Sequence, residues 1–149
     1  MIPTSGRAMG LDVGERRIGV AIADELGLIA SPLTVVTRRP GDLLEIRDLA
    51  REKGVDRVVV GLPMGLSGRE GPQAAAVREF AEELRAVLAE SPRLVFWDER
   101  LTTAVAERAL RERGGRRNRQ KGEVDAMAAA VILQGYLDAA RSRKRAEEP

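Results

Sequence analysis

The stretch AMGLDVGERRIGVAIA, residues 8–23, decides the fold. Two runs of apolar and small residues, 8–13 and 18–23, lie on either side of the polar sequence GER, which is typical of a turn. The pattern predicts a hairpin of two antiparallel strands. A third strand is predicted over 30–36, after another short connection, so the chain is expected to begin with an antiparallel sheet.

Beyond this region the spacing of apolar residues alternates between that of amphipathic helices and that of buried strands. Helices are predicted over 42–53, 73–90, 103–113 and 122–140, and strands over 55–61 and 93–97. The order predicts an α/β fold with a mixed five-stranded sheet, three antiparallel strands followed by parallel strands, flanked by helices. The helix-linked strands should run parallel to the first strand.

Composition limits the possible classes of protein. The chain has 149 residues, 44% of them hydrophobic, which favours one domain spanning 1–149, with 1–7 and 142–149 expected to be flexible. It contains no Cys and no His, which excludes disulfides, thiol catalysis, histidine bases and the usual zinc sites. Without a membrane-spanning run or a signal-peptide pattern, we expect a cytoplasmic protein with no membrane partner.

Asp12 interrupts the otherwise apolar strand predicted over 8–13. The two-residue period of a strand puts it on the same face as Gly10 and Gly14, which should leave open space above the carboxylate. A carboxylate in that position can bind a ligand, or it can simply cap the turn that begins at Gly14.

Asp98 and Glu99 directly follow the strand predicted over 93–97. Alternation sends adjacent side chains to opposite faces, so one of the two is expected to join a site shared with Asp12. The spacing does not choose between them. The alternative is a capping residue together with an ion pair to Arg100.

Asp125 lies near the start of the last predicted helix. At helical spacing it shares a face with Ala128, Ala129, Ile132 and Tyr136. An acid on such a face would be buried against the sheet, where an unpaired charge costs several kcal/mol. The helix dipole stabilises an acid in the first turn of a helix. This would explain why Asp125 lies near the start of the helix, but not why it lies on the face that packs against the sheet.

The predicted topology can bring these acids together from the first strand, the last strand and the last helix. Three carboxylates without His or Cys suit a hard divalent cation, either Mg²⁺ or Mn²⁺. Sites of this kind hold two ions roughly 3.5–4 Å apart and catalyse attack of water on a phosphodiester. The residues therefore predict a metal-dependent phosphodiester hydrolase.

Four segments carry a resemblance to a known family. They are GLDVGERRIGVAIAD (10–24), VVGLPMGLSGREGPQA (59–74), DERLTT (98–103) and KGEVDAMAAAVILQGYL (121–137). By these motifs the chain resembles the YqgF/RuvX family, known as Holliday junction resolvases or pre-16S rRNA nucleases. The resemblance implies an RNase H-like fold and a metal-dependent nuclease in 5′-end processing of pre-16S rRNA, with DNA four-way junctions as the alternative substrate.

Carried over motif by motif, the resemblance gives Asp12, Glu99 and Asp125 as the catalytic and metal-binding acids, and it selects Glu99 over Asp98. Basic residues near them are candidate phosphate contacts. These are Arg16, Arg17, Arg69 and Arg100, together with Arg116, Arg117, Arg119 and Lys121 in a basic loop over 114–121. The glycine-rich loop over 62–72 is either a phosphate cradle or an ordinary mobile loop.

The expected partner is structured RNA, with DNA junctions as the alternative, and the protein is either a monomer or a homodimer. A junction resolvase would need a symmetric dimer to cut two strands. Two other classes compete with the nuclease. A nucleotide-binding protein of the actin or sugar-kinase type begins with a similar D-x-G strand and turn, and a nucleic-acid-binding module could keep the fold without cutting.

Overall fold

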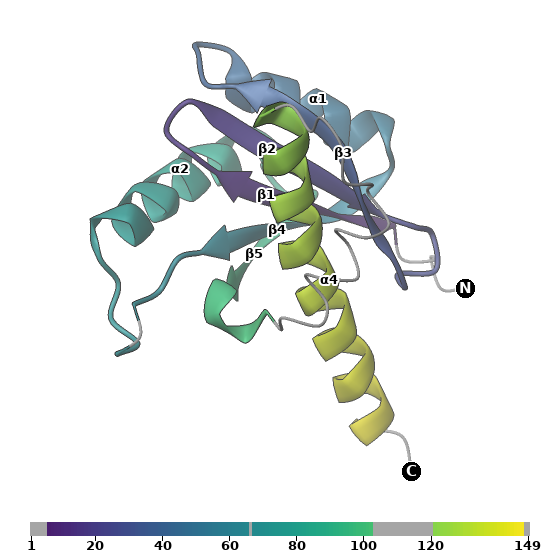
Figure 1. The fold of residues 1–149 in the computed structure, drawn as a ribbon. Helices are drawn as coiled ribbons and strands as arrows, with labels where there is room; N and C mark the ends of the chain where they lie inside the picture. Colours follow the sequence, from purple (N-terminus) through teal and green to yellow (C-terminus); the bar gives the residue numbers. More distant parts are fainter. Residues whose placement is uncertain (1–5, 66, 103–120, 148–149) are drawn as a thin grey trace.

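The computed structural model describes residues 6–65, 67–102 and 121–147, which form one sheet with helices on both faces (Figure 1). The strands are β1 (Arg7–Val13), β2 (Arg17–Ala23), β3 (Ala30–Thr37), β4 (Val55–Leu62) and β5 (Arg93–Asp98). The helices are α1 (Asp42–Glu52), α2 (Pro72–Leu88), the 3₁₀ helix η1 (Glu99–Leu101) and α4 (Lys121–Glu147). The helix predicted over 103–113 lies outside the described residues.

Within the part of the chain that the structure describes, the sheet has five strands in the order β3-β2-β1-β4-β5. β1 pairs with β2, and β2 with β3, in antiparallel fashion, whereas β1 pairs with β4, and β4 with β5, in parallel fashion. The predicted mixed sheet is therefore confirmed. The arrangement places β1 at the centre of the sheet, with the carboxyl ends of the three parallel strands at one edge.

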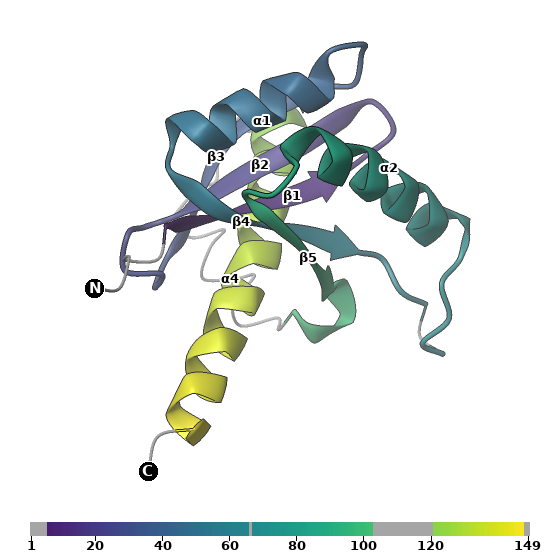
Figure 2. The same ribbon diagram turned by 180° about the vertical axis from the view of Figure 1, so that it is seen from behind.

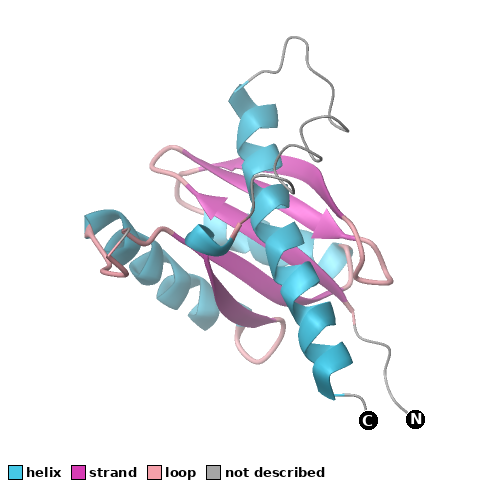
Figure 3. Ribbon diagram, turned by 60° about the horizontal axis from the view of Figure 1, so that its bottom comes forward, coloured by secondary structure: helices cyan, strands magenta, loops and turns pink. Residues whose placement is uncertain are grey.

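The two faces of the sheet are covered differently. α1 and α2 lie on one face (Figure 2), where large side chains fill the core, among them Met9, Leu11, Ile46, Phe80 and Leu84. α4 crosses the other face diagonally (Figure 3), where half of the buried core residues are alanines, among them Ala8, Ala21, Ala129 and Ala130. Small residues on both sides of this second interface let α4 approach the strands closely.

Glycines make that approach closer still. A Cβ atom added to Gly19 would lie 1.9 Å from the backbone oxygen of Asp125, and one added to Gly10 would lie 2.8 Å from Cβ of Leu133. Both distances are far below van der Waals contact. α4 therefore packs closely on strand backbone between Asp125 and Leu133. Gly10 was expected to help leave open space above the Asp12 carboxylate, and for Gly10 this prediction is wrong, because α4 lies against it.

The last helix is longer than the sequence indicates. α4 begins at Lys121 and ends at Glu147, so residues 141–147 are helical and not an irregular charged tail. The arginines in this segment are good helix formers, and Arg141 pairs with Asp138 one turn earlier. Within the described part of the chain, no helix combines the length and apolar character needed to cross a bilayer.

The close packing of α4 predicts that Gly19→Ala destabilises the protein. Its methyl group would overlap the Asp125 carbonyl, and relief of that overlap should cost roughly 1–3 kcal/mol of the free energy of unfolding. Gly71→Ala is the matched control, since nothing lies within 4 Å of its added Cβ and its φ of −96° suits any residue. Urea denaturation measures the free energy of unfolding of both variants. Equal stability of Gly19→Ala and Gly71→Ala would contradict the close packing of α4 on β2.

Candidate active site

The three acids come from three elements and share the face of the sheet that α4 covers. Asp12, in β1, lies opposite Gly19 in the strand register, and Gly19 lies beneath the backbone of Asp125 in α4. Glu99 begins η1, directly after β5, and its Oε2 lies 3.1 Å from where a Cβ of Gly61 would be. Glycine thus makes room for the backbone of Asp125 at position 19 and for the carboxylate of Glu99 at position 61.

Asp12 and Glu99 are two partly buried carboxyls that repel each other. Burial raises the pKa of Asp12, and the charge of Asp125 raises it further. Burial also raises the pKa of Glu99, to about 7, with smaller contributions from Asp12 and Asp98. Within the described residues, neither side chain has an ion pair or hydrogen-bond partner. Such strain among acids is typical of a site that takes up a proton or a cation.

Asp125 differs from the other two acids because it has a basic partner. Arg17 Nε donates to its Oδ2 over 2.6 Å. Asp125 is the fifth residue of α4, beyond the first turn, so the stabilising effect of a helix N-terminus on a first-turn acid does not explain its position. Its helical neighbours Ala129 and Ile132 are buried against the sheet, as the spacing predicted.

Asp98 has a structural role that separates it from Glu99. Its carboxylate accepts from the Arg100 backbone N–H, as the cap of η1, and from the Arg100 guanidinium. The side-chain hydrogen bond from Arg100 lowers the pKa of Asp98. The capping and ion-pair alternative thus describes Asp98, while Glu99 is the acid that lies near Asp12.

The donor chemistry of this site fits a hard cation in part. Carboxylate oxygens are the ligands that Mg²⁺ and Mn²⁺ prefer, and Asp12 with Glu99 offers them without a competing cation. Among the residues that the structure describes, however, no group of three or more acidic side chains is arranged to hold a metal ion.

The candidate phosphate contacts fall into three groups. Arg16 and Arg69 are exposed, and their side chains have no ion pair within the described residues. Arg17 and Arg100 are instead engaged by acids. The remaining candidates give no contact to report: Arg116, Arg117 and Arg119 lie outside the described residues, and Lys121 is the first residue of α4 and not part of a loop.

The glycine-rich loop uses part of its own backbone. The N–H of Gly65 donates to the carbonyl of Arg69 over 3.0 Å, and the N–H of Gly68 donates to the carbonyl of Gly65 over 2.9 Å. Gly68 has a φ of +84°, which explains a glycine at that position. These two amides are committed to a turn, so they are not the free donors that a phosphate cradle requires.

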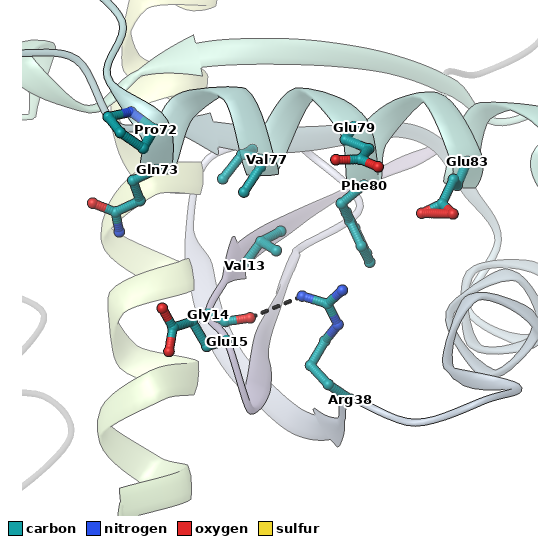
Figure 4. Close-up of a pocket in the computed structure, with 11 residues that line it drawn as sticks. Val13, Gly14, Glu15, Arg38, Pro72, Gln73, Val77, Glu79, Phe80 and Glu83 are labelled. Carbon is teal, nitrogen blue, oxygen red and sulfur yellow. Dashed lines mark hydrogen bonds between the residues drawn. The ribbon is translucent and has the colours of Figure 1, made fainter.

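A pocket of about 780 Å³ lies on the other face of the sheet (Figure 4). Arg38 contributes to its wall and donates through Nη1 to the carbonyl of Gly14 over 2.9 Å, as Figure 4 shows. The pocket is also lined by three carboxylates, those of Glu15, Glu79 and Glu83. Carboxylates repel phosphate, and β1 separates this pocket from Asp12, so it is not part of the acidic site.

Sequence reasoning missed the contributions of Gly19 and Gly61. Glycine inside a strand weakens it and often marks the close approach of another backbone, which was the available signal. Gly19 follows Ile18 within β2, Gly61 lies in the apolar second half of β4, and both face α4 or Glu99. The pairing of Arg17 with Asp125, 108 residues apart in the chain, gave no local signal.

Known proteins and a family model match this chain over nearly its whole length. Residues 6–139 match the model of the RuvX family, described as Holliday junction resolvase. A protein of Chloroflexus aggregans is 50% identical over 136 residues, covering 90% of this chain and 94% of the relative. One of Symbiobacterium thermophilum is 50% identical over 139 residues, covering 92% and 95%. Both names provisionally assign a pre-16S rRNA nuclease.

Two solved structures share the fold. T. thermophilus RuvC in complex with a Holliday junction substrate has a TM-score of 0.60 at 18% identity, covering 91% of this chain and 96% of that one. The Fowlpox virus resolvase in complex with Holliday junction DNA has a TM-score of 0.56 at 11% identity, covering 90% and 98%. These likenesses confirm the predicted RNase H-like fold, and the sequence matches show that the chain belongs to the RuvX family of nucleases.

Proposed function

We propose that this protein is a divalent-metal-dependent nuclease that processes the 5′ end of pre-16S rRNA, with Asp12, Glu99 and Asp125 as its metal-binding and catalytic acids. The observation that carries the proposal is the pair of partly buried, mutually repelling carboxyls at Asp12 and Glu99, which lack a cationic partner in the described residues. The names of the 50% identical relatives support the choice of pre-16S rRNA.

Each acid contributes in a way that follows from its surroundings. The backbone of Asp12 is held by strand pairing at the centre of the sheet, and its carboxyl is partly buried, with a raised pKa. Glu99, with a pKa of about 7, can hold a proton near neutral pH, and a bound cation would displace that proton. A bound Mg²⁺ or Mn²⁺ would activate water and stabilise the leaving oxygen of the phosphodiester.

Basic side chains would orient the substrate backbone. Arg16, in the turn before β2, and Arg69, in the glycine-rich loop, are exposed and have no ion pair within the described residues, so both can receive phosphate groups. Arg116, Arg117, Arg119 and Lys121 remain predicted contacts. Binding through such groups should weaken steeply as salt is raised.

A DNA four-way junction is the second candidate substrate. The description of the family model and the junction complexes of two structural neighbours favour it. Cutting two strands symmetrically would require a homodimer, whereas trimming an RNA end requires only a monomer. The sequence relatives favour nuclease activity over the nucleotide-binding and non-catalytic alternatives. A nuclease that acts on pre-16S rRNA would work in the cytoplasm, and this is the location we propose.

Asp12→Asn should lower the rate of metal-dependent cleavage by at least about 100-fold, because it removes a charge at the reacting centre. Asp48→Asn is the control, since Asp48 is an exposed acid on α1. Cleavage of pre-16S rRNA and of a four-way DNA junction, measured with both variants and the wild type, also separates the two substrates. Undiminished cleavage by Asp12→Asn would rule out the proposed role of the acids.

Glu99 predicts a pH dependence of stability in the metal-free protein. Folding raises the pKa of Glu99 from 4.5 to about 7, so the folded protein holds this proton more tightly than the unfolded chain does. The contribution of Glu99 to the free energy of unfolding is therefore complete below pH 4.5 and is lost as the pH rises through 7. Glu99→Gln removes this loss and should be more stable than the wild type at pH 8 by roughly 1 kcal/mol, after allowance for solvent screening.

Urea denaturation of both proteins with a chelator present, at intervals from pH 4.5 to 8, measures that difference. It should grow in favour of Glu99→Gln as the pH rises. A difference that does not vary with pH would mean that the carboxyl of Glu99 is not strained in the folded protein.

A further inference from the structure

Arg17 connects the turn between β1 and β2 with α4. Its carbonyl accepts from the N–H of Gly14 over 2.9 Å, which holds the turn, while its guanidinium reaches across to Asp125 over 2.6 Å. The side chains of Arg17 and Asp125 are 37% and 27% exposed, so water screens the contact only in part. The fold thus places one guanidinium directly against the acidic site.

The charges of the site do not balance. Asp12, Glu99 and Asp125 carry three negative charges when ionised, and Arg17 is the one basic residue among those described that is bonded to any of them. Even with Arg17 in place, Asp125 still repels Asp12, and Asp12 still repels Glu99. A divalent cation would supply the missing positive charge, and at Asp125 it would compete for the carboxylate to which Arg17 donates.

The contact of Arg17 with Asp125 is a limited one. It is made through Nε and Oδ2, and within the described residues Oδ1 of Asp125 has no partner. Arg100, in contrast, binds Asp98 through its backbone N–H, through Nε to both oxygens, and through Nη2. One hydrogen bond from a partly exposed side chain is readily exchanged, whereas the bonds between Arg100 and Asp98 hold that acid in place.

We propose that Arg17 is a displaceable counter-ion of the acidic site: it pairs with Asp125 while no metal is bound, and it leaves Asp125 when a divalent cation binds. The inference rests on the proposed function, since it takes the three acids as the metal ligands. After displacement the guanidinium remains beside the site, where it can contact the phosphate of the substrate. Arg17 is therefore a positioning residue that competes with the metal.

This competition predicts that removal of the guanidinium strengthens metal binding. Arg17→Gln should bind Mn²⁺ about fivefold more tightly than the wild type, in the absence of nucleic acid, because the ion no longer has to break an ion pair of this kind. Arg16→Gln is the matched control. It loses the same charge at the adjacent position, where the exposed side chain pairs with no acid among the described residues.

Isothermal titration calorimetry with Mn²⁺ measures the three affinities. Tighter binding by Arg17→Gln, with Arg16→Gln within about twofold of the wild type, supports the counter-ion. Equal or weaker binding by Arg17→Gln than by Arg16→Gln overturns it and would mean that Arg17 orients Asp125 for the metal. Failure of the wild type to bind Mn²⁺ at all would instead contradict the proposed function, and the inference with it.

A second measurement uses the wild type, in case Arg17→Gln does not fold. The Nε–H resonance of Arg17, assigned by its absence from the spectrum of Arg17→Lys, reports on the hydrogen bond to Asp125. Titration with Mg²⁺ should move this resonance toward the position of a free arginine as the site fills. An unchanged resonance at saturating Mg²⁺ would overturn the inference.

Discussion

The site depends on the contact of α4 with bare strand backbone. A helix normally lies on a layer of side chains, but Gly19 leaves no room for any atom between β2 and the carbonyl of Asp125. Because Gly19 is also the strand partner of Asp12, the same contact brings two acids together from elements more than 100 residues apart. Gly61 acts similarly for Glu99, whose carboxylate lies over its backbone.

Proximity of like charges then determines the chemistry. Asp12 is repelled by Asp125, and Glu99 by Asp12, and partly buried carboxyls that repel each other resist ionisation unless a positive charge compensates them. Asp125 pairs with the guanidinium of Arg17, whereas Asp12 and Glu99 have no basic partner within the described residues and have raised pKa values. Asp98, one residue from Glu99, is fully paired and has a lowered pKa. The pKa values of these two neighbouring acids are thus shifted in opposite directions because their partners differ.

Much of the fold could be predicted from local patterns. The two runs of apolar and small residues at 8–13 and 18–23, on either side of a polar turn, predicted the central hairpin, and the change to helical spacing predicted α1 and α2. The choice between Asp98 and Glu99 could not come from alternation, because the chain leaves the strand at Asp98 and turns into η1, where alternation no longer applies.

Other features depended on contacts between distant residues. The end of α4 at Glu147 was missed because a run of charged residues is typical of a solvated tail as well as of an exposed helix. The space expected beside Gly10 is occupied by α4, which no spacing within β1 could reveal. The ion pair of Arg17 likewise joins two elements whose relative placement only the folded chain determines.

The central claim is that Asp12 and Glu99 bind a divalent cation together. Diffraction from crystals soaked in Mn²⁺, with data collected for anomalous scattering, tests it most directly. The account predicts an anomalous peak roughly 2.0–2.5 Å from a carboxylate oxygen of each of these residues. A peak elsewhere on the protein, or none at a Mn²⁺ concentration that supports cleavage, would contradict it.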